Sequence, residues 1–367
     1  MSVCFCGIRV LVITKHDLMN NKRKLGESDI FITPITIGCW SFGGGEYWGK
    51  QSWRDVHDVV NTALDAGINA FDTAEMYNNG ESEYSLGKAL KGRREQAVII
   101  SKIGPSNCYY VREHCIESLK RLGTDYLDVY MIHWPINKLS VEHFTSDKRS
   151  IDTLPTIEET CAQLNELKKE GLIRAIGMSN FGQEQMKEIL ATDTRIAVNE
   201  ISYNIVSRAI EAEIVPFCMK NNISIIGSMG LQQGLLAGIY RVPDDVPPHQ
   251  AHSRHFSQKR GEGISRHNEA GVEKELFEVL EQLRRIADEL HISMAQLSIA
   301  WTLKKPFMTS TLIGSRNLKQ LKSNMEALFL ELSDDTERLI DDISQPILDL
   351  LGNNPDYYEN TSRSRIY

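Results

Sequence analysis

The alternation of short apolar runs with amphipathic stretches constrains the fold of this chain most strongly. From residue 30 onward, an apolar run rich in β-branched residues recurs eight times. These runs span 33–40, 68–74, 97–103, 126–134, 173–180, 196–202, 223–229 and 310–315. Continuous rather than alternating apolar runs are typical of strands that are buried on both faces of a parallel sheet.

The stretches between these runs have the pattern of helices. Residues 53–67 place Val56, Val60 and Leu64 on one face and end in Gly67, a residue that often terminates helices. Thr156, three residues before Glu159, predicts a capping box. The stretches interpreted as helices are 53–67, 81–92, 110–123, 156–171, 209–222, 275–290 and 317–328.

Strand–helix units that repeat in this way, with no linker between them, predict an α/β fold of the (β/α)8 or TIM barrel type in a single domain. A doubly wound open sheet is the rival, but it would usually carry a glycine-rich fingerprint after its first strand, and none is present. We expect the barrel to occupy residues 23–345. Residues 1–22 would form an N-terminal extension that need not belong to the fold, and residues 346–367 a C-terminal tail.

The N-terminal segment does not have the pattern of a membrane span or a secretion signal. Residues 3–13 are apolar but are interrupted by Arg9, and a membrane helix needs about 20 apolar residues. A basic start and a small-residue cleavage site are also missing. We expect Met19 to be the functional start, with Met1 as the alternative.

Charge and cysteine content restrict the partners and the compartment. The net charge of −8, without a block of Lys and Arg, argues against nucleic acid or an anionic membrane as the main partner. The seven cysteines are odd in number and scattered, and only Cys4 and Cys6 are close together. This pattern predicts a reducing, cytoplasmic environment. The oligomeric state stays open.

Polar side chains with complementary chemistry follow three consecutive predicted strands. Asp72 ends the second strand and Tyr77 follows five residues later, Lys102 ends the third strand, and His133 ends the fourth. Each also has a structural interpretation: a helix cap for the aspartate, an ion pair for the lysine, a core position for the histidine. Because strand ends converge at the mouth of a barrel, we expect the four to form one catalytic site.

The four side chains suit proton transfer to a carbonyl oxygen. A tyrosine has an ordinary pKa of about 10, and a nearby ammonium lowers that pKa. A carboxylate such as Asp72 would keep a buried lysine charged. His133 could orient the substrate oxygen. General acid catalysis of this kind contributes about 10²–10⁴-fold, but none of these groups supplies a hydride, so a redox cofactor is required.

The motifs that carry these residues resemble those of the aldo-keto reductase family. They are FDTAEMY (71–77), SK (101–102), MIHWP (131–135), GMSNF (177–181) and LIGSRNLKQLKSN (312–324). The resemblance extends over residues 23–345.

The resemblance implies a role for each matching residue. Tyr77 would be the proton donor, Lys102 and Asp72 would adjust its pKa, and His133 would orient the carbonyl. The nicotinamide cofactor would contact Gly38, Cys39, Trp40, Asp72, Ser179, Asn180, Glu200, Ser228, Leu231, Gly234, Gly314, Ser315, Arg316, Gln320 and Asn324. The substrate would contact Trp40, Tyr77, His133 and Trp134.

The adenosine end of the cofactor site has independent physical support. Gly314 precedes a helix that starts at Asn317, and a helix N-terminus favours an anion. Arg316 could form a bidentate contact with a phosphate there, although a surface arginine beside a helix cap is the alternative. The functional interpretation favours a 2′-phosphate, hence NADPH/NADP with NADH as the second choice.

Two positions depart from the family pattern. Members commonly have Gln after the Asn of the sixth strand, whereas here Asn199 is followed by Glu200. Many members carry an aromatic residue at the end of the seventh strand, where this chain has Ser228. The stacking contact with nicotinamide would therefore be lost or supplied elsewhere.

The insertion at 241–272 contains His249, His252 and His255, with Arg254 among them. A metal site is the weaker interpretation, because no cysteine or carboxylate cluster accompanies the histidines. We expect no metal, and we expect Arg254 to reach the cofactor phosphates as the loop folds over them.

These observations predict an NADP-dependent oxidoreductase that interconverts a carbonyl (aldehyde, ketone or sugar) and an alcohol or polyol. The alternative is a catalytically weak, cofactor-binding sensor or regulatory subunit, because ion-channel β subunits resemble the same family. A metal-dependent barrel lyase or isomerase has little support, since the strand ends lack a carboxylate cluster.

Overall fold

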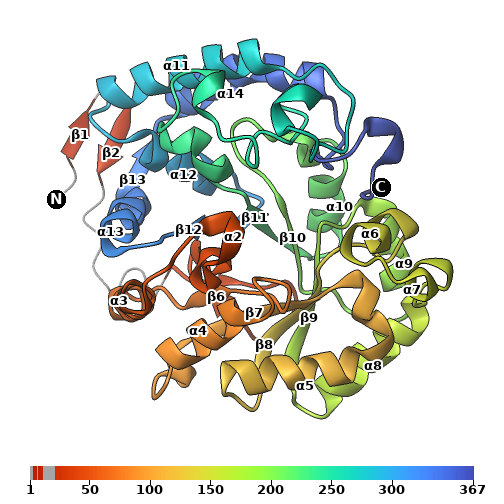
Figure 1. Cartoon of the computed structure of the whole chain (residues 1–367). Helices are drawn as coiled ribbons and strands as arrows, with labels where there is room; N and C mark the ends of the chain where they lie inside the picture. The colour runs from red at the N-terminus through yellow and green to blue at the C-terminus, as the bar shows by residue number, and fades with distance from the viewer. Residues whose placement is uncertain (1–2, 6, 11–20) are drawn as a thin grey trace.

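The computed structural model describes residues 3–5, 7–10 and 21–367 of the chain. Eight parallel strands close into a barrel and helices surround it (Figure 1). The strands are β5 (Ile35–Gly38), β6 (Ala70–Asp72), β7 (Val98–Ile103), β8 (Leu127–Ile132), β9 (Ile173–Ser179), β10 (Val198–Ser202), β11 (Ser224–Ser228) and β12 (Met308–Gly314). The predicted (β/α)8 barrel is confirmed, and each apolar run overlaps one of its strands, although β12 begins two residues before the predicted run.

Helices follow the strands. They are α3 (Trp53–Ala66), α4 (Glu81–Ala89), α5 (Val111–Leu122), α8 (Ile157–Lys169), α9 (Gln183–Leu190), α10 (Ile214–Lys220), α11 (Glu273–Glu289), α12 (Met294–Lys304), α13 (Leu318–Glu326) and α14 (Asp334–Leu351). The seven predicted stretches each overlap one of these helices, whereas α9, α12 and α14 were not predicted. Short helices α2 (Gly45–Trp48), α6 (Lys138–Phe144) and α7 (Lys148–Asp152) lie in the loops. Thr156 caps α8 by accepting from the Glu159 amide at 3.2 Å, as expected.

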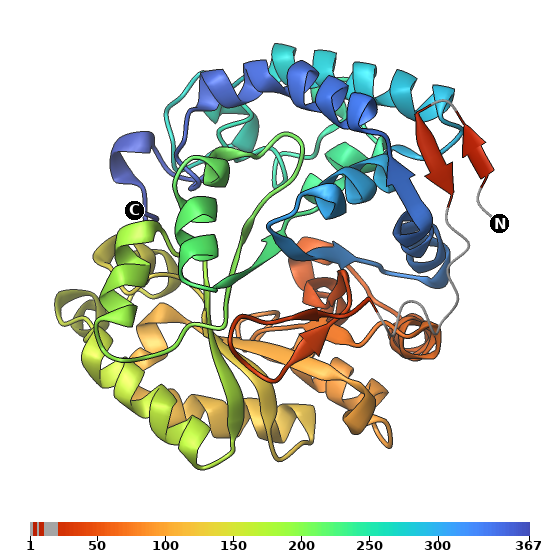
Figure 2. The same cartoon turned by 180° about the vertical axis from the view of Figure 1, so that it is seen from behind.

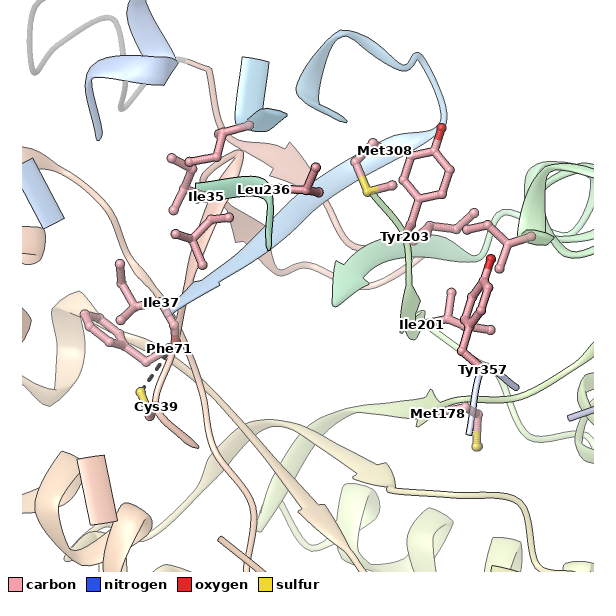
Figure 3. Packing of buried hydrophobic residues seen from close by; sticks show 14 of the residues in the cluster. Ile35, Ile37, Cys39, Phe71, Met178, Ile201, Tyr203, Leu236, Met308 and Tyr357 are labelled. Atoms are coloured by element: carbon pink, nitrogen blue, oxygen red, sulfur yellow. Dashed lines mark hydrogen bonds between the residues drawn. The ribbon is translucent and has the colours of Figure 1, made fainter. Parts of the chain in front are cut away.

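Residues on the barrel strands alternate between two apolar layers because successive side chains point to opposite faces. Ile35 and Ile37 on β5 face outward and pack in the larger cluster between strands and helices (Figure 3). Val129 and Met131 on β8 belong to a separate cluster inside the barrel. The same alternation decides which polar residues point into the mouth.

A hairpin closes the end of the barrel opposite the mouth. It consists of β3 (Arg23–Lys24) and β4 (Phe31–Ile32), and Figure 2 views this side. Leu25 and Ile32 of this hairpin are fully buried in the inner cluster. The Gly26 amide donates to Ser224 Oγ at 2.8 Å, which ties the hairpin to the start of β11. The hairpin therefore covers the amino-terminal end of the barrel.

A small antiparallel sheet lies at the outer edge. Here β2 (Ile8–Val10) pairs with both β1 (Val3–Phe5) and β13 (Leu330–Leu332). Part of the predicted extension 1–22 thus pairs with β13, whereas the predicted start at Met19 lies outside the described residues. The boundary predicted at residue 345 falls inside α14.

None of the helices in the described ranges combines the length and the apolar character that crossing a bilayer requires.

Candidate active site

Inward-facing residues at the carboxyl ends of β6, β7 and β10 form the base of the site. Asp72 is paired in register with Gly38, and Lys102 with Met131. Lys102 and Asp72 are almost fully buried, at 0% and 1% exposed, and Glu200 is 4% exposed. Three ionisable groups therefore meet inside the barrel, where water screens their charges poorly.

Lys102 is held tightly by Asp72. Its Nζ atom donates to Asp72 Oδ1 and Oδ2, each at 2.5 Å, and to the Thr73 carbonyl at 3.0 Å. Burial alone would lower the pKa of Lys102, but the carboxylates of Asp72 and Glu200 outweigh it and raise that pKa above its ordinary value. The charged form of Lys102 is thus favoured.

Tyr77 lies beside both Lys102 and His133. Its hydroxyl is 3.4 Å from Lys102 Nζ and 3.4 Å from His133 Nε2. The turn after Tyr77 is fixed by Asn78, which has a left-handed backbone at φ +50° and whose Nδ2 donates to the Gly43 carbonyl at 2.7 Å. The loop therefore brings the phenol to the predicted amine and imidazole.

Charge in the site opposes ionisation of Tyr77. Burial raises the pKa of Tyr77 above its ordinary value, and although Lys102 lowers it, Asp72 and Glu200 raise it further. The ammonium of Lys102 acts on the pKa of Tyr77 in the expected direction, but burial of the phenol, with the two carboxyl groups, outweighs it.

His133 is poised as a neutral hydrogen-bonding group. Burial, with the nearby Lys102 charge, lowers the pKa of His133 well below its ordinary value. Its backbone amide donates to the Ile103 carbonyl at 2.9 Å, which fixes the start of the loop after β8. Its Nδ1 atom is buried and has no partner within the described residues. A neutral imidazole can donate one hydrogen bond to a substrate oxygen.

Glu200 adds a second carboxyl to the Lys102–Asp72 pair. Its Oε1 atom is 3.5 Å from Lys102 Nζ, and its buried Oε2 atom has no hydrogen-bond partner in the described structure. Burial, and then the charge of Asp72, raise the pKa of Glu200 well above its ordinary value. An orphaned buried oxygen of this kind is a natural acceptor for a ligand.

The end of β9 presents further polar atoms beside Glu200. Ser179 is buried and is paired in register with Glu200. Asn180 donates through Nδ2 to the His133 carbonyl and to Ser179 Oγ, each at 3.0 Å. Together with the free Glu200 Oε2, these groups fit the donors and acceptors of a carboxamide, so the residues present are compatible with a nicotinamide. Ser228, at the end of β11, offers no aromatic surface.

An aromatic wall lines one side of the site. Trp40 stacks on Tyr77 at 5.7 Å and on Tyr47 at 5.0 Å between ring centroids. Gln233, between the predicted cofactor residues Leu231 and Gly234, donates to the Tyr47 hydroxyl at 2.6 Å and so joins two loops. Tyr47 was not among the predicted residues, because it belongs to a loop without periodicity.

The predicted adenosine-end residues lie together at the start of α13. The Arg316 amide donates to Gln320 Oε1 at 2.8 Å, and Asn324 Nδ2 donates to Ser315 Oγ at 3.1 Å. The Arg316 side chain contacts the loop after α2, through Gln51 Oε1 at 3.1 Å and the Lys50 carbonyl at 2.8 Å. Gly314 ends β12 beside them, and no heavy atom lies within 4 Å of the position a Cβ would take there.

Cys39 corrects one prediction of a cofactor contact. It shares the outward parity of Ile35 and Ile37, is fully buried in the outer cluster, and donates through Sγ to the Ile37 carbonyl at 3.4 Å (Figure 3). Its side chain therefore points away from the mouth, while Gly38 and Trp40 border it.

Arg254 corrects a second prediction. Its guanidinium is 3% exposed, pairs with Glu269 at 2.7 Å, and donates to the Leu351 carbonyl at 2.7 Å. These bonds fix the 241–272 loop to the C-terminal segment, so the side chain is not free to reach a phosphate. His255 of the same loop is also committed, with its Nε2 atom 2.7 Å from the Val206 carbonyl.

The C-terminal tail packs beside the site. Asp356 and Arg365 form a buried ion pair at 2.7 Å, and the Arg365 guanidinium lies 3.8 Å from the centre of the Trp134 ring. The Tyr367 carbonyl accepts from the Gln185 amide at 3.4 Å and lies where a Cβ on Gly182 would clash with it. The predicted substrate residue Trp134 is thus held from the tail side.

Comparison with known proteins gives consistent matches over nearly the whole chain. The model of the aldo/keto reductase family matches residues 34–345. An NADH-specific methylglyoxal reductase from Escherichia coli (strain K12) is 32% identical over 354 residues, covering 89% of this chain and 99% of that protein.

Two further matches represent different functional classes. A probable voltage-gated potassium channel subunit beta from Oryza sativa subsp. japonica is 29% identical, covering 83% of this chain and 90% of that protein. The solved structure of the glycerol dehydrogenase from Gluconobacter oxydans is similar at a TM-score of 0.70 and 25% identity, covering 91% of this chain and 97% of that one.

Proposed function

The chain belongs to the aldo/keto reductase family, and from that premise we propose that it is an NADPH-dependent reductase that interconverts a small aldehyde, ketone or sugar and its alcohol. The observation that carries the proposal is the position of the Tyr77 hydroxyl, 3.4 Å from both Lys102 Nζ and His133 Nε2. A phenol beside an ammonium and an imidazole suits proton donation to a carbonyl oxygen.

Each polar side chain of the site has one role in the proposed carbonyl reduction. Tyr77 gives its proton to the carbonyl oxygen, and the positive charge of Lys102 stabilises the phenolate that remains. His133 donates a hydrogen bond that orients the same oxygen. A bound reduced nicotinamide supplies the two electrons, as hydride, to the carbonyl carbon. Asp72 keeps Lys102 charged and in place.

Cofactor contacts follow from the polar groups around the mouth. We assign Ser179, Asn180 and Glu200 to the carboxamide, and the start of α13 to the adenosine end. Arg316 favours a 2′-phosphate and hence NADPH, although the similar Escherichia coli protein is described as NADH-specific. NADH therefore remains the second cofactor to test.

The substrate would enter beside Trp40 and Trp134. We propose small-molecule carbonyls or polyols, since the relatives include a methylglyoxal reductase and a glycerol dehydrogenase. The five buried free cysteines in the described part of the chain suit a reducing cytoplasm.

The test is a titration with NADPH and NADH, followed by a panel of aldehydes, ketones and sugars with nicotinamide absorbance as the readout. Turnover of at least one carbonyl substrate supports the proposal. Binding of cofactor without turnover on any substrate would favour the second candidate, a cofactor-binding regulatory subunit, which the similarity to a potassium channel β subunit supports.

A further inference from the structure

We propose that Glu200 holds a proton in the resting site and releases it when an oxidised, positively charged nicotinamide is bound. This inference rests on the function proposed above. It makes Glu200 a group that senses the redox state of the cofactor, so that binding of NADP⁺ depends on pH in a way that binding of NADPH does not.

The Lys102 ammonium has three N–H groups that it can donate. The three shortest contacts of Lys102 Nζ go to the two Asp72 carboxylate oxygens at 2.5 Å and to the Thr73 carbonyl at 3.0 Å. Glu200 Oε1, at 3.5 Å, has the longest of the carboxyl contacts with this ammonium. The Glu200 carboxyl group is also hydrogen-bonded to the Asp72 carboxyl group, which requires a proton between the two.

Glu200 Oε2 is buried and has no partner within the described residues, and the residue is only 4% exposed. An ionised carboxylate that has only this long contact with a donor and that faces a second carboxylate is very unfavourable in such a place, so the group neutralises instead. Asp72, which already has two ammonium contacts, keeps the negative charge. The proton of the pair therefore sits on Glu200.

Four other titratable groups lie in the same site. Lys102 on β7 is held in its charged form by the ion pair with Asp72 on β6. Tyr77, on the loop after β6, and His133, at the end of β8, are both neutral, since the pKa of Tyr77 is raised and that of His133 is well lowered. Glu200, whose raised pKa favours its neutral form, is the remaining group of this set whose charge a bound cation can change.

A bound nicotinamide would change the charge beside Glu200. The reduced nicotinamide ring is neutral and the oxidised ring carries a positive charge. An opposite charge within about 4–6 Å favours the ionised form of a carboxyl group. Glu200 would thus remain a neutral acid beside NADPH, with a hydroxyl donor and a carbonyl acceptor like those of an amide. Beside NADP⁺ its O–H bond breaks and the proton passes to the solvent.

The consequence is a linkage between pH and cofactor redox state. As pH rises through the range in which only the NADP⁺ complex has an ionised Glu200, NADP⁺ binding tightens by up to about tenfold per pH unit. Above that range the effect levels off, because free protein is then ionised as well. NADPH binding does not follow this dependence.

The experiment measures proton release on binding by calorimetry in two buffers of different ionisation enthalpy, with NADP⁺ and NADPH as the probes. The variants are Glu200→Gln, which keeps the shape and an amide acceptor, and Glu46→Gln, which removes a carboxylate from the exposed surface of α2. We expect the wild-type protein and Glu46→Gln to release close to one proton with NADP⁺ and much less with NADPH. Glu200→Gln should bind both and release no such proton.

Equal proton release for the two cofactors, or release that persists in Glu200→Gln, would overturn the inference while leaving the proposed reductase intact. If neither cofactor binds the wild-type protein, the proposed function fails together with it. Should Glu200→Gln not fold, infrared difference spectra of the wild-type protein decide the matter. Adding NADP⁺ must then remove the C=O band of a protonated carboxyl group, and an unchanged band contradicts the proposal.

Discussion

Lys102 and Asp72 form a fully buried ion pair in which one Nζ atom lies 2.5 Å from each carboxylate oxygen. The pair fixes the ammonium where it can act on the Tyr77 hydroxyl, 3.4 Å away. Removing the charge of Asp72 while keeping its shape should leave Lys102 less firmly placed and its pKa lower. The geometry of the whole site depends on this contact.

Asp72→Asn should lower kcat by about 10²-fold, because stabilisation of the Tyr77 phenolate weakens. Cofactor affinity should change much less. Steady-state kinetics and cofactor titration on the purified variant measure both. Asp65→Asn, which changes a 70% exposed aspartate on α3, is the matched control and should behave as the parent does. A variant Asp72→Asn with undiminished kcat would show that the charge of the pair is not needed.

Arg316→Gln tests the adenosine end of the cofactor site. Loss of a charge-assisted contact with a 2′-phosphate should weaken NADPH binding by about 10–10²-fold and leave NADH binding almost unchanged. Dissociation constants from fluorescence titration measure the effect, with Arg285→Gln on α11 as the control. A parallel loss for both cofactors would mean that Arg316 only supports the loop it contacts through Gln51.

The Glu75–His114 pair should make stability depend on pH. His114 Nδ1 lies 2.7 Å from Glu75 Oε2, and this contact raises the pKa of His114. The stabilisation is complete below the unfolded-state pKa of about 6.5 and is lost as pH rises through the folded-state pKa. His114→Asn should therefore lower the free energy of unfolding by about 0.5–1 kcal/mol near pH 6 and by less near pH 9.

Chemical denaturation of the two proteins at both pH values measures this difference. His291→Asn, at an exposed position after α11, is the control and should show no such pH-dependent loss. A loss for His114→Asn that grows with pH would reverse the predicted sign and exclude the ion pair as its source.

The Asp356–Arg365 pair should control docking of the C-terminal tail. Both side chains are at most 1% exposed, and breaking a buried pair by removing one partner costs about 3–5 kcal/mol. Asp356→Asn should therefore expose the tail to carboxypeptidase and raise KM, since Arg365 packs on Trp134. Asp335→Asn, at an exposed ion pair, is the control. Unchanged protection of the tail would contradict the assignment.

Much of the fold could be predicted because parallel strands are buried on both faces and leave continuous apolar runs. Helix α12 was not predicted, because it is buried on nearly all sides and therefore lacks an amphipathic period. The pairing of β2 with β13 depends on residues more than 300 positions apart, and no local pattern announces it.

The candidate site could be predicted where its residues lie on barrel strands, because successive side chains on a strand point to opposite faces. Asp72, Lys102, Ser179 and Glu200 share the inward parity of their strands, and the same rule applied to β5 would have placed Cys39 outside. Arg254 could not be judged from sequence, because its partner Glu269 lies in an irregular loop and the Leu351 carbonyl lies at the end of α14, which was not predicted. The raised pKa of Tyr77 depends first on burial of the phenol and then on neighbouring charges, and the fold alone brings these together.

The most direct test of the account is the turnover of Tyr77→Phe, measured beside its cofactor affinity. If Tyr77 is the general acid, kcat falls by at least about 10²-fold while the dissociation constant for NADPH and the melting temperature stay close to those of the parent. Turnover within about tenfold of the parent, with normal cofactor binding, would contradict the central claim.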